Sequence, residues 1–419
     1  FLRDRRTPVG SRLARGLGTR RLQPQLLWLV LIAALAGLAS ALIVPLTWGD
    51  RTRIPFAPGF ALLWLIGAAS AVGAAWQARF HRLAALTMLG AVGLVLCITF
   101  AWFSAPDLAL TQLAVEVVTM VLFLLGLRWM PKRTEPDDPR IAPRAWWRRR
   151  RDLLIALLVG AGLAALSYAL QTRNAPLSIS PYFLEHALPV GGGTNVVNVM
   201  LVDFRAFDTL GEITVLGIVG ISVYALLRRF RPPREAQEVP EQQRLAPEVT
   251  GRDLIDRAAQ TDRLQEYLEV PAVLVRLLLP VAALYAFHLF MRGHNEPGGG
   301  FVAGLVVAIA FIAQYMVSGA RWIEERMHLQ PPRWIGFGLM AALLTGAGAL
   351  ALGYPFLTTH TAHVHWPLVG EVHLPTAAIF DLGVFAVVVG ATLLMLTAIA
   401  HQSLRARRRD TPEAAAQGN

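Results

Sequence analysis

Long runs of hydrophobic residues alternate with short polar connections along the chain. A run of about 20 apolar residues with few charges is long enough for an α-helix to cross a lipid bilayer. About ten windows of this kind occur, and they are centred near Ile32, Leu65, Val92, Met120, Leu157, Gly217, Val281, Ala308, Leu343 and Val388. The pattern predicts an all-α integral membrane protein with about ten transmembrane helices.

The composition agrees with a membrane protein. Of the 419 residues, 55% are hydrophobic and 16% are charged, and the mean hydropathy is +0.48. A soluble domain carries about a quarter charged residues. The single cysteine, Cys97, lies inside an apolar run, so a disulfide framework is excluded and we expect a small packing residue. The chain begins at Phe1 without a cleavable signal pattern, and we expect it to be part of something longer.

Basic residues gather in every second connection, and the net charge is +11. By the positive-inside rule these connections are cytoplasmic. We therefore expect a multi-pass protein of the cell inner (plasma) membrane with both termini in the cytoplasm. The alternative, that the basic tails bind nucleic acid, does not explain the alternation. The arginine-rich segments are residues 3–21, 79–82, 132–151, 228–231, 321–326 and 405–409.

Two polar linkers, at about residues 131–151 and 230–270, divide the predicted helices into groups of four, two and four. Residues 252–269 of the second linker could form a short amphipathic surface helix. The glycine-rich stretches GGGT (191–194) and GGGF (298–301) lack the lysine of a phosphate loop. They favour close approach of helices over nucleotide binding.

Glu116 is a carboxylate near the middle of an apolar run. Because a charge at that depth costs at least about 2.5 kcal/mol, such a residue is a candidate for ion translocation. Gln112, Glu116 and Thr119 recur at i, i+4 and i+7, so they form one polar stripe that should face other helices or water. A protonated glutamate that only fixes packing is the alternative. Asp107, at the outer end of the same run, either caps the helix after Pro106 or takes part in ion movement.

Further carboxylates occur near the outer ends of apolar runs. Asp208 and Glu212 stand at i and i+4 and repel each other, which favours protonation of one of them or a cation between them. Asp208 could also be only a helix cap, and a local ion pair with Arg205 accounts for Asp203. Asp381 is a lone carboxylate roughly two turns into an apolar run.

The segment FHLFMRGHNEPGGGF, residues 287–301, interrupts two apolar runs. His294, Asn295 and Glu296 offer side-chain ligands at a helix end, so His294 and Glu296 are further ion-translocation candidates. Pro297 prevents simple helical continuation, and the glycines let the chain return in close packing.

A histidine-rich outer loop holds His360, His363, His365 and His373. Spacing of this kind can hold a metal, but no cysteine or carboxylate completes a rigid set of four ligands. We expect these histidines to be solvated and dispensable. No nucleophile with a base and an orienting group is recognisable, so we expect no enzyme, no cofactor and no metal.

Three segments together resemble the multisubunit monovalent cation/proton antiporter (Mrp) family, as the C-terminal part of its A subunit fused to its B subunit. SAPDLALTQLAVEVVTMVLFLLGLRWMP (104–131) is similar to a late part of the A subunit, which itself resembles a component of energy-converting hydrogenases. GGGTNVVNVMLVDFRAFDTLGEITVLGIVGISVYALL (191–227) is similar to the next block of the same protein. Residues from about 270 to 402, with FHLFMRGHNEPGGGFVAGLVVA and PTAAIFDLGVFAVVVGATLL, resemble the B subunit.

The resemblance implies a domain order along the chain. It consists of a basic N-terminal segment with the first helix (1–57), a three-helix domain similar to the hydrogenase D subunit (58–131), a two-helix domain similar to the hydrogenase E subunit (152–230), a cytoplasmic linker (231–269), a four-helix domain similar to the antiporter B subunit (270–403) and a cytoplasmic tail (404–419). The chain departs from the family pattern because the large proton-pumping half of the A subunit does not precede these segments. A truncated sequence or a split gene would explain this.

The resemblance also implies a function. It indicates a transporter component that exchanges Na+, or else Li+ or K+, for protons, together with an antiporter-like proton-pumping subunit and small membrane subunits. An ion-translocating membrane component of a hydrogenase-type, complex I-like redox assembly is the alternative. A purely structural membrane scaffold is a third hypothesis, and the lone intramembrane carboxylates argue against it.

Overall fold

The computed structural model describes residues 22–43, 47–51, 55–78, 80–127, 142–174, 178–229, 254–326, 330–366 and 370–409. The basic segment before residue 22, residues 230–253 of the second linker and residues 410–419 of the tail lie outside this part of the chain. The chain divides into two compact units, which are Phe1–Phe56 with Arg133–Ser178 and Ala57–Lys132 with Ile179–Asn419. We call them the first and the second unit.

The described residues form ten helices that are long and apolar enough to cross a membrane. This confirms the predicted fold class. The helical elements are α2 (Leu22–Ile43), α3 (Pro58–Gln77), α4 (Arg82–Trp102), α5 (Pro106–Leu127), α6 (Ala142–Thr172), α7 (Ser180–His186), α8 (Val196–Val199), the π-helical turn η1 (Met200–Phe204), α9 (Ala206–Arg229), α11 (Leu254–Arg292), α12 (Gly300–Arg326), α13 (Pro331–Ala351) and α14 (Ala377–Arg409).

The first unit contains α2 and α6, which polar contacts join near both of their ends. Gln23 Nε2 donates to Asp152 Oδ2 at 2.7 Å near one end. Near the other end, the Arg173 guanidinium donates to Thr47 Oγ1 at 3.1 Å. The faces between these contacts carry exposed leucines, as expected for helices that meet lipid or another protein.

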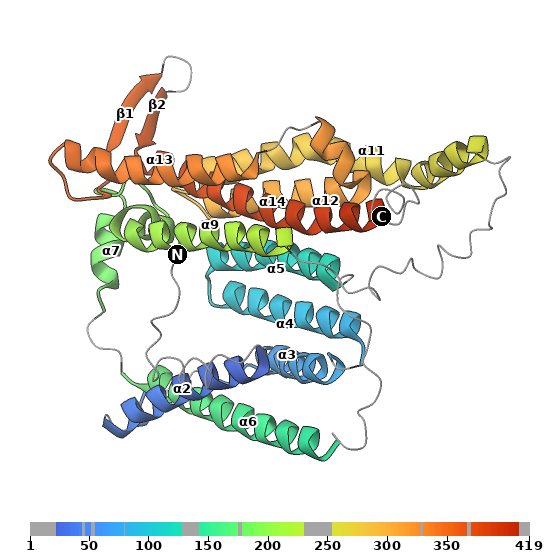
Figure 1. Ribbon diagram of the computed structural model, residues 1–419. Coiled ribbons are helices and arrows are strands. Elements are labelled where there is room, and N and C mark those ends of the chain that lie inside the picture. The colour runs from blue at the N-terminus through green and yellow to red at the C-terminus, as the bar shows by residue number, and fades with distance from the viewer. Residues whose placement is uncertain are drawn as a thin grey trace, which may run out of the picture. The chain divides into compact units, whose positions relative to one another are not determined.

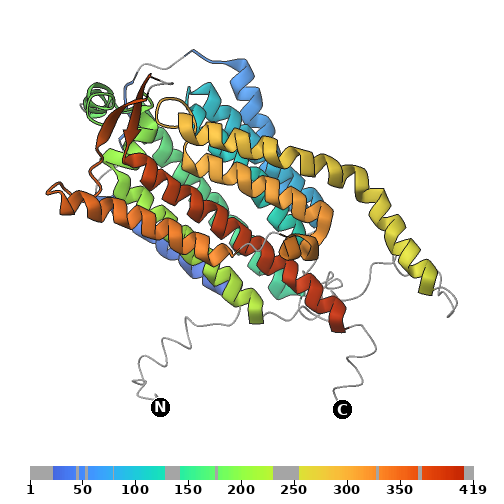
Figure 2. The same ribbon diagram turned by 90° about the horizontal axis from the view of Figure 1, so that it is seen from above.

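The second unit is organised around α14. Of its most apolar window 72% is buried, against at most 50% for any other described span. The helix runs beside α9, α12 and α13 in both views (Figures 1 and 2), and it supplies core residues such as Phe380, Val384 and Val387. A Cβ atom at Gly383 would lie only 2.6 Å from the Gly338 carbonyl oxygen. Glycines therefore allow α13 and α14 to pack backbone against backbone.

Two regions differ in detail from the expectation. The histidine-rich loop contains an antiparallel hairpin of β1 (Thr361–Trp366) and β2 (Gly370–Pro375), in which His363 pairs with His373 (Figure 1). The β-branched residues Thr361, Val364 and Val372 and the aromatic Trp366 favour strands. The expected separate surface helix over residues 252–269 is instead the beginning of α11, which runs unbroken for 39 residues. That is about 58 Å, so part of α11 extends beyond the hydrocarbon layer of about 30 Å.

Candidate functional site

Four segments of the second unit meet on one side of its helices. They are the start of α5, the stretch that leads into α8, the turn between α11 and α12, and the start of α14. We define the polar junction as Asp107, residues 191–199, residues 292–300 and Asp381. All four segments were expected on the outer side from the alternation of charge, and the structure confirms that they share one side.

Asn195 connects three of these segments. Its side-chain nitrogen lies 3.2 Å from Asp107 Oδ2, 3.1 Å from the Gly293 carbonyl oxygen and 3.0 Å from the Glu296 carbonyl oxygen. Its side-chain oxygen accepts from the Asn198 backbone N–H at 3.3 Å. An amide group has two donor hydrogens, so the three acceptors share them. The sequence analysis did not single out Asn195.

Asp107 binds residues that are remote in the sequence. Its Oδ1 accepts from the Gly298 backbone N–H at 3.0 Å, and its Oδ2 accepts from Asn195. Because a carboxylate at a helix N-terminus is also favoured by the helix dipole, this position suits a negative charge. The contacts show that the side chain fastens α5 to the turn between α11 and α12, in addition to the two roles considered from the sequence.

Asp381 forms a hydrogen bond with the backbone at the beginning of α12. Its Oδ2 accepts from the Gly300 backbone N–H at 2.7 Å. A Cβ atom at Gly300 would lie 2.6 Å from Asp381 Oδ1, so a glycine is needed for this approach. The expected depth of roughly two turns is wrong, because β2 continues to Pro375 and α14 begins only at Ala377. Asp381 lies about one turn into its helix.

The turn between α11 and α12 is held by its own side chains. Arg292 donates from Nε to the Pro297 carbonyl oxygen at 2.9 Å and forms an ion pair with Glu296 at 3.3 Å. The ring nitrogen Nε2 of His294 lies 2.8 Å from the Gly191 carbonyl oxygen. Gly299 has a φ of +99°, which side chains rarely permit. His294 and Glu296, both predicted site residues, thus have structural partners.

The expected ion pair between Asp203 and Arg205 is wrong. Arg205 forms its ion pair with Asp208, whereas Asp203 Oδ1 accepts from the Thr359 backbone N–H at 3.2 Å. Asp203 lies within the π-helical turn η1 and Arg205 follows directly after it. Residues two positions apart in a helical turn do not face each other. Burial raises the pKa of the Asp203 carboxyl, and the hydrogen bond from Thr359 and the charge of His294 oppose this.

Glu116 occupies a different place, inside the α4–α5 contact. Gln112 Nε2 lies 3.5 Å from Glu116 Oε2, which is the long limit of a hydrogen bond. A Cβ atom at Gly93 of α4 would collide with the Glu116 carboxylate, and one at Gly90 would lie 3.7 Å from its Oε1. Glu116, the middle residue of the polar stripe, therefore faces α4, and Thr119 is half-buried one turn further on.

Glu212 and Asp208 lie together near the beginning of α9, and both are exposed. The ion pair of Asp208 with Arg205 offsets the repulsion that the sequence predicted between the two carboxylates. The structure also reveals buried polar residues that the sequence analysis did not name, above all Gln314 of α12, with no exposed surface, and Thr392 of α14 at 3%. Neither residue carries a charge, so charge alone could not reveal them.

The predicted residues thus fall into three groups. Asp107, Asp381, His294 and Glu296 belong to the polar junction, Gln112, Glu116 and Thr119 to the α4–α5 contact, and Asp208 and Glu212 to α9. Among the described residues no three His, Cys, Asp or Glu side chains are placed to hold a metal ion. The side chains of His363, His365 and His373 lie outside the described residues, and His360 stacks near Tyr354.

Three family models match the chain. They are described as the D subunit of MBH for residues 66–132, the E subunit of MBH for residues 147–244, and a domain related to the MnhB subunit of Na+/H+ antiporter for residues 270–394. Asp107 lies in the first of these ranges, residues 191–199 lie in the second, and residues 292–300 and Asp381 lie in the third.

Among curated relatives, the chain is 53% identical over 403 residues to a probable K(+)/H(+) antiporter A/B subunit of Rhizobium meliloti. The match covers 94% of this chain and 40% of the relative, so the chain spans well under half of that protein. It is 37% identical over 131 residues to the Na(+)/H(+) antiporter B subunit of Alkalihalophilus pseudofirmus, covering 31% of this chain and 91% of the relative.

Among solved structures, the fold is similar to a chain of the Mrp complex from Dietzia sp. DQ12-45-1b. The TM-score is 0.73 with 29% sequence identity, and the match covers 94% of this chain and 40% of the other. The curated relatives are named as antiporter subunits, which are transporters and not enzymes. The resemblance read from the three sequence segments is confirmed, and the chain belongs to the Mrp family of multisubunit cation/proton antiporter proteins.

Proposed function

We propose that the chain is a membrane component of an antiporter that exchanges a monovalent cation for protons and is driven by the proton gradient. Sodium is the first candidate for the cation, with lithium and potassium as alternatives. The family membership supports this, and the names of the relatives include both Na(+)/H(+) and K(+)/H(+) antiporter subunits. The proposal includes further subunits as partners, among them an antiporter-like proton-pumping subunit and small membrane subunits.

The single observation that carries the proposal is the placement of Glu116. Its carboxylate lies inside a membrane span, against the glycine face of α4, with Gln112 at the limit of hydrogen bonding. An ionised carboxylate without a partner is strongly disfavoured at that depth. The group is therefore stable with a bound proton or a desolvated cation, and competition between the two at one site would couple their movement.

The other predicted carboxylates complete the proposed pathway. Glu212, exposed on α9, and Asp208 would take part near the outer side, together with Asp107, Asp381, His294 and Glu296 of the polar junction. In this proposal the outer group supplies ions and Glu116 exchanges them. The three-domain organisation expected from the sequence belongs to the proposal, and the ranges of the three family models support it.

A membrane component of a hydrogenase-like redox assembly is the second candidate. Two of the matching models, over residues 66–132 and 147–244, are described as MBH subunits. The MnhB-related model and the similarity across 94% of the chain to an antiporter protein favour the first candidate.

Transport in everted membrane vesicles tests the proposal. An antiporter collapses a preformed proton gradient when the cation is added, without an electron donor, so a fluorescent pH probe should respond to Na+, Li+ or K+. Glu116→Gln should abolish the response while the partner subunits still copurify, and Glu116→Asp should retain part of it. Glu212→Gln should behave like Glu116→Gln. The matched control is Glu185→Gln, which neutralises an exposed glutamate of α7.

Normal transport by an assembled Glu116→Gln complex would remove this residue from the ion pathway. A proton movement that required an electron donor in the wild type would instead favour the redox assembly. The cation that gives the largest response at equal concentration identifies the substrate.

The proposed orientation places both termini in the cytoplasm of a cell with the protein in its inner membrane. The charge alternation supports it. In whole cells an impermeant thiol reagent should label a cysteine placed at Asn295 and should not label one placed at Glu238, which lies outside the described residues. The reverse labelling pattern would overturn the orientation.

A further inference from the structure

One face of α6 forms a hollow near the beginning of the helix, within its arginine-rich segment. The hollow has a volume of about 750 Å³ and is lined by Trp147, Arg148, Arg150, Arg151 and Leu154. Residues at i, i+1, i+3, i+4 and i+7 share one side of an α-helix. The lining is therefore a single face, with an aromatic side chain at one end, arginines along it and an apolar side chain at the other end.

The arginines of this face differ in their partners. Arg151 forms an ion pair with Asp152 at 2.7 Å, and Asp152 also accepts from Gln23. The Arg150 guanidinium carbon lies 3.6 Å from the centre of the Trp146 ring. A guanidinium that stacks on a ring uses its flat face, so its N–H donors in the plane can still bind an anion. The lining holds three arginines and no acid. One neighbouring acid, Asp152, attracts Arg151 and Arg148, so the net charge of the face remains positive.

The depth of the hollow indicates what covers it. The span that begins at Trp146 runs for 27 residues to Thr172, or about 40 Å. The hydrocarbon layer is about 30 Å thick, so the first residues of the span lie in the headgroup layer, where tryptophan and arginine are favoured. Directly below, Leu153 and Leu154 are 59% and 57% exposed. A ligand here meets cationic donors above and an apolar surface beneath.

We propose that this face of α6 binds an anionic phospholipid, with the phosphodiester on Arg148 and Arg150 and an acyl chain along Leu154. A lipid fits better than a free anion, because only a lipid also covers the leucine and the tryptophan ring. Fork-shaped guanidinium groups bind phosphate oxygens in pairs, which gives the headgroup a defined position. The site belongs to the first unit, and every residue of the proposed ion pathway belongs to the second.

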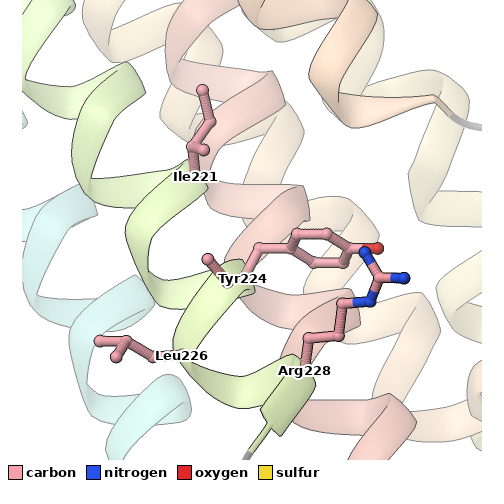
Figure 3. Close-up of a pocket in the computed structure, with 5 residues that line it drawn as sticks. Ile221, Tyr224, Leu226 and Arg228 are labelled. Carbon is pink, nitrogen blue, oxygen red and sulfur yellow. The ribbon is translucent and has the colours of Figure 1, made fainter. Parts of the chain in front are cut away.

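A second hollow, on α9, combines the same kinds of side chain with fewer arginines. Its volume is about 700 Å³, and Ile221, Tyr224, Leu226 and Arg228 are among its lining residues (Figure 3). The side chains of Tyr224 and Arg228 extend toward one another in this view. An aromatic ring, an arginine and apolar side chains thus recur at the end of another span, in a connection that the charge alternation places on the same side as the start of α6.

Lipid titration of the full chain in detergent, read by native mass spectrometry, tests the proposal. Dioleoylphosphatidylglycerol should bind, and dioleoylphosphatidylcholine, with the same chains and no net charge, should bind much more weakly. Each basic residue near an anionic headgroup contributes about 1 kcal/mol, or about a fivefold change in affinity. Arg148→Gln should therefore weaken binding of the anionic lipid about fivefold, and Arg148→Gln with Arg150→Gln should weaken it more than about tenfold.

The matched control is Arg149→Gln, which removes the same charge from the neighbouring position that does not line the hollow. Because Arg149 does not line the hollow, its loss should weaken binding less than the loss of Arg148 does. Equal losses in Arg148→Gln and Arg149→Gln, or equal binding of the two lipids, would overturn the proposal. Competition by inorganic phosphate would show a free-anion site instead of a lipid site. If the double variant loses its thermal transition, Arg148→Lys with Arg150→Lys replaces it and should bind with intermediate affinity.

Discussion

Asp107 and Glu116 belong to the same helix, α5, but their surroundings are opposite. Asp107 accepts from the Gly298 backbone and from the Asn195 side chain, two groups that lie far away in the sequence. Glu116 has Gln112 at 3.5 Å and faces a helix surface made of glycines. A carboxylate with several fixed donors holds segments together, whereas one with a single weak donor and space beside it can change its bound proton or ion. The comparison separates the polar junction, which fastens the helices, from the α4–α5 contact, which is suited to transport.

Gly93→Ala should have the largest effect on transport, because the added methyl group would collide with the Glu116 carboxylate. A displacement that costs about 1.4 kcal/mol would weaken ion binding by the carboxylate about tenfold. We therefore expect the rate of cation/proton exchange in the vesicle assay to decrease at least about tenfold. Gly90→Ala is the matched control, since its methyl group would meet mainly the flexible end of Met120. Equal activity of the two variants would mean that Glu116 does not need this space.

Asn195→Ala should have the largest effect on stability. It removes the donor that Asp107, Gly293 and Glu296 share. A hydrogen bond to a charged group contributes about 1.5 to 3 kcal/mol, and all three acceptors would lose their donor at once. We therefore expect a clear decrease in the thermal unfolding temperature and poorer recovery of the chain in detergent. Thr194→Ala, which removes the hydroxyl that contacts the Asn295 carbonyl oxygen and, at 3.5 Å, Asn295 Oδ1, should cost less because neither acceptor is charged. If Asn195→Ala unfolds at the wild-type temperature, the junction does not hold these helices together.

Asp107→Asn should be milder than either change. The amide oxygen can still accept from Gly298, but the amide nitrogen cannot accept from Asn195, so one of the two bonds is lost. We expect a loss of about 1 kcal/mol in unfolding free energy and largely preserved exchange, measured on the same preparations. Loss of exchange without loss of stability would make Asp107 as essential to ion exchange as Glu116 and would remove the contrast between the two carboxylates.

Asp203 should make the free energy of unfolding depend on pH. Because burial raises its pKa above that in the unfolded chain, the native state binds the proton more tightly. The stability that protonated Asp203 contributes is therefore present below the unfolded value of 3.8 and decreases as the pH rises through the folded value. As the pH is raised from about pH 4, the unfolding temperature of the wild type should decrease relative to that of Asp203→Asn. A constant difference between the two proteins across this range would contradict the assigned environment.

The spans and the direction of Glu116 were predictable from the sequence, because both follow from helical periodicity. The junction was not, because its bonds join Asn195 and Asp107, 88 positions apart, and Asp107 and Gly298, 191 positions apart. Many of them use backbone groups, which every residue carries. The glycines and the RGHNEPGGGF segment indicated a close approach, but they did not identify its partners. The helical turns around Asp203 and Arg205 place these two side chains in different directions, so the nearest opposite charge in the sequence was the wrong partner, and Arg205 pairs with Asp208 three positions on.

The histidine-rich loop offers the smallest expected effect. His360 stacks near Tyr354, and His363 and His365 belong to β1. A metal site needs three or four ligands at fixed distances, and we expect these loop histidines to be solvated. Histidine to alanine changes in a strand leave the backbone pairing of the hairpin in place. His360→Ala, His363→Ala and His365→Ala together should therefore leave the sodium tolerance of a complemented antiporter-deficient strain unchanged. Reduced tolerance at normal protein levels would show that this hairpin carries a site, and transport would then depend on three regions of the second unit.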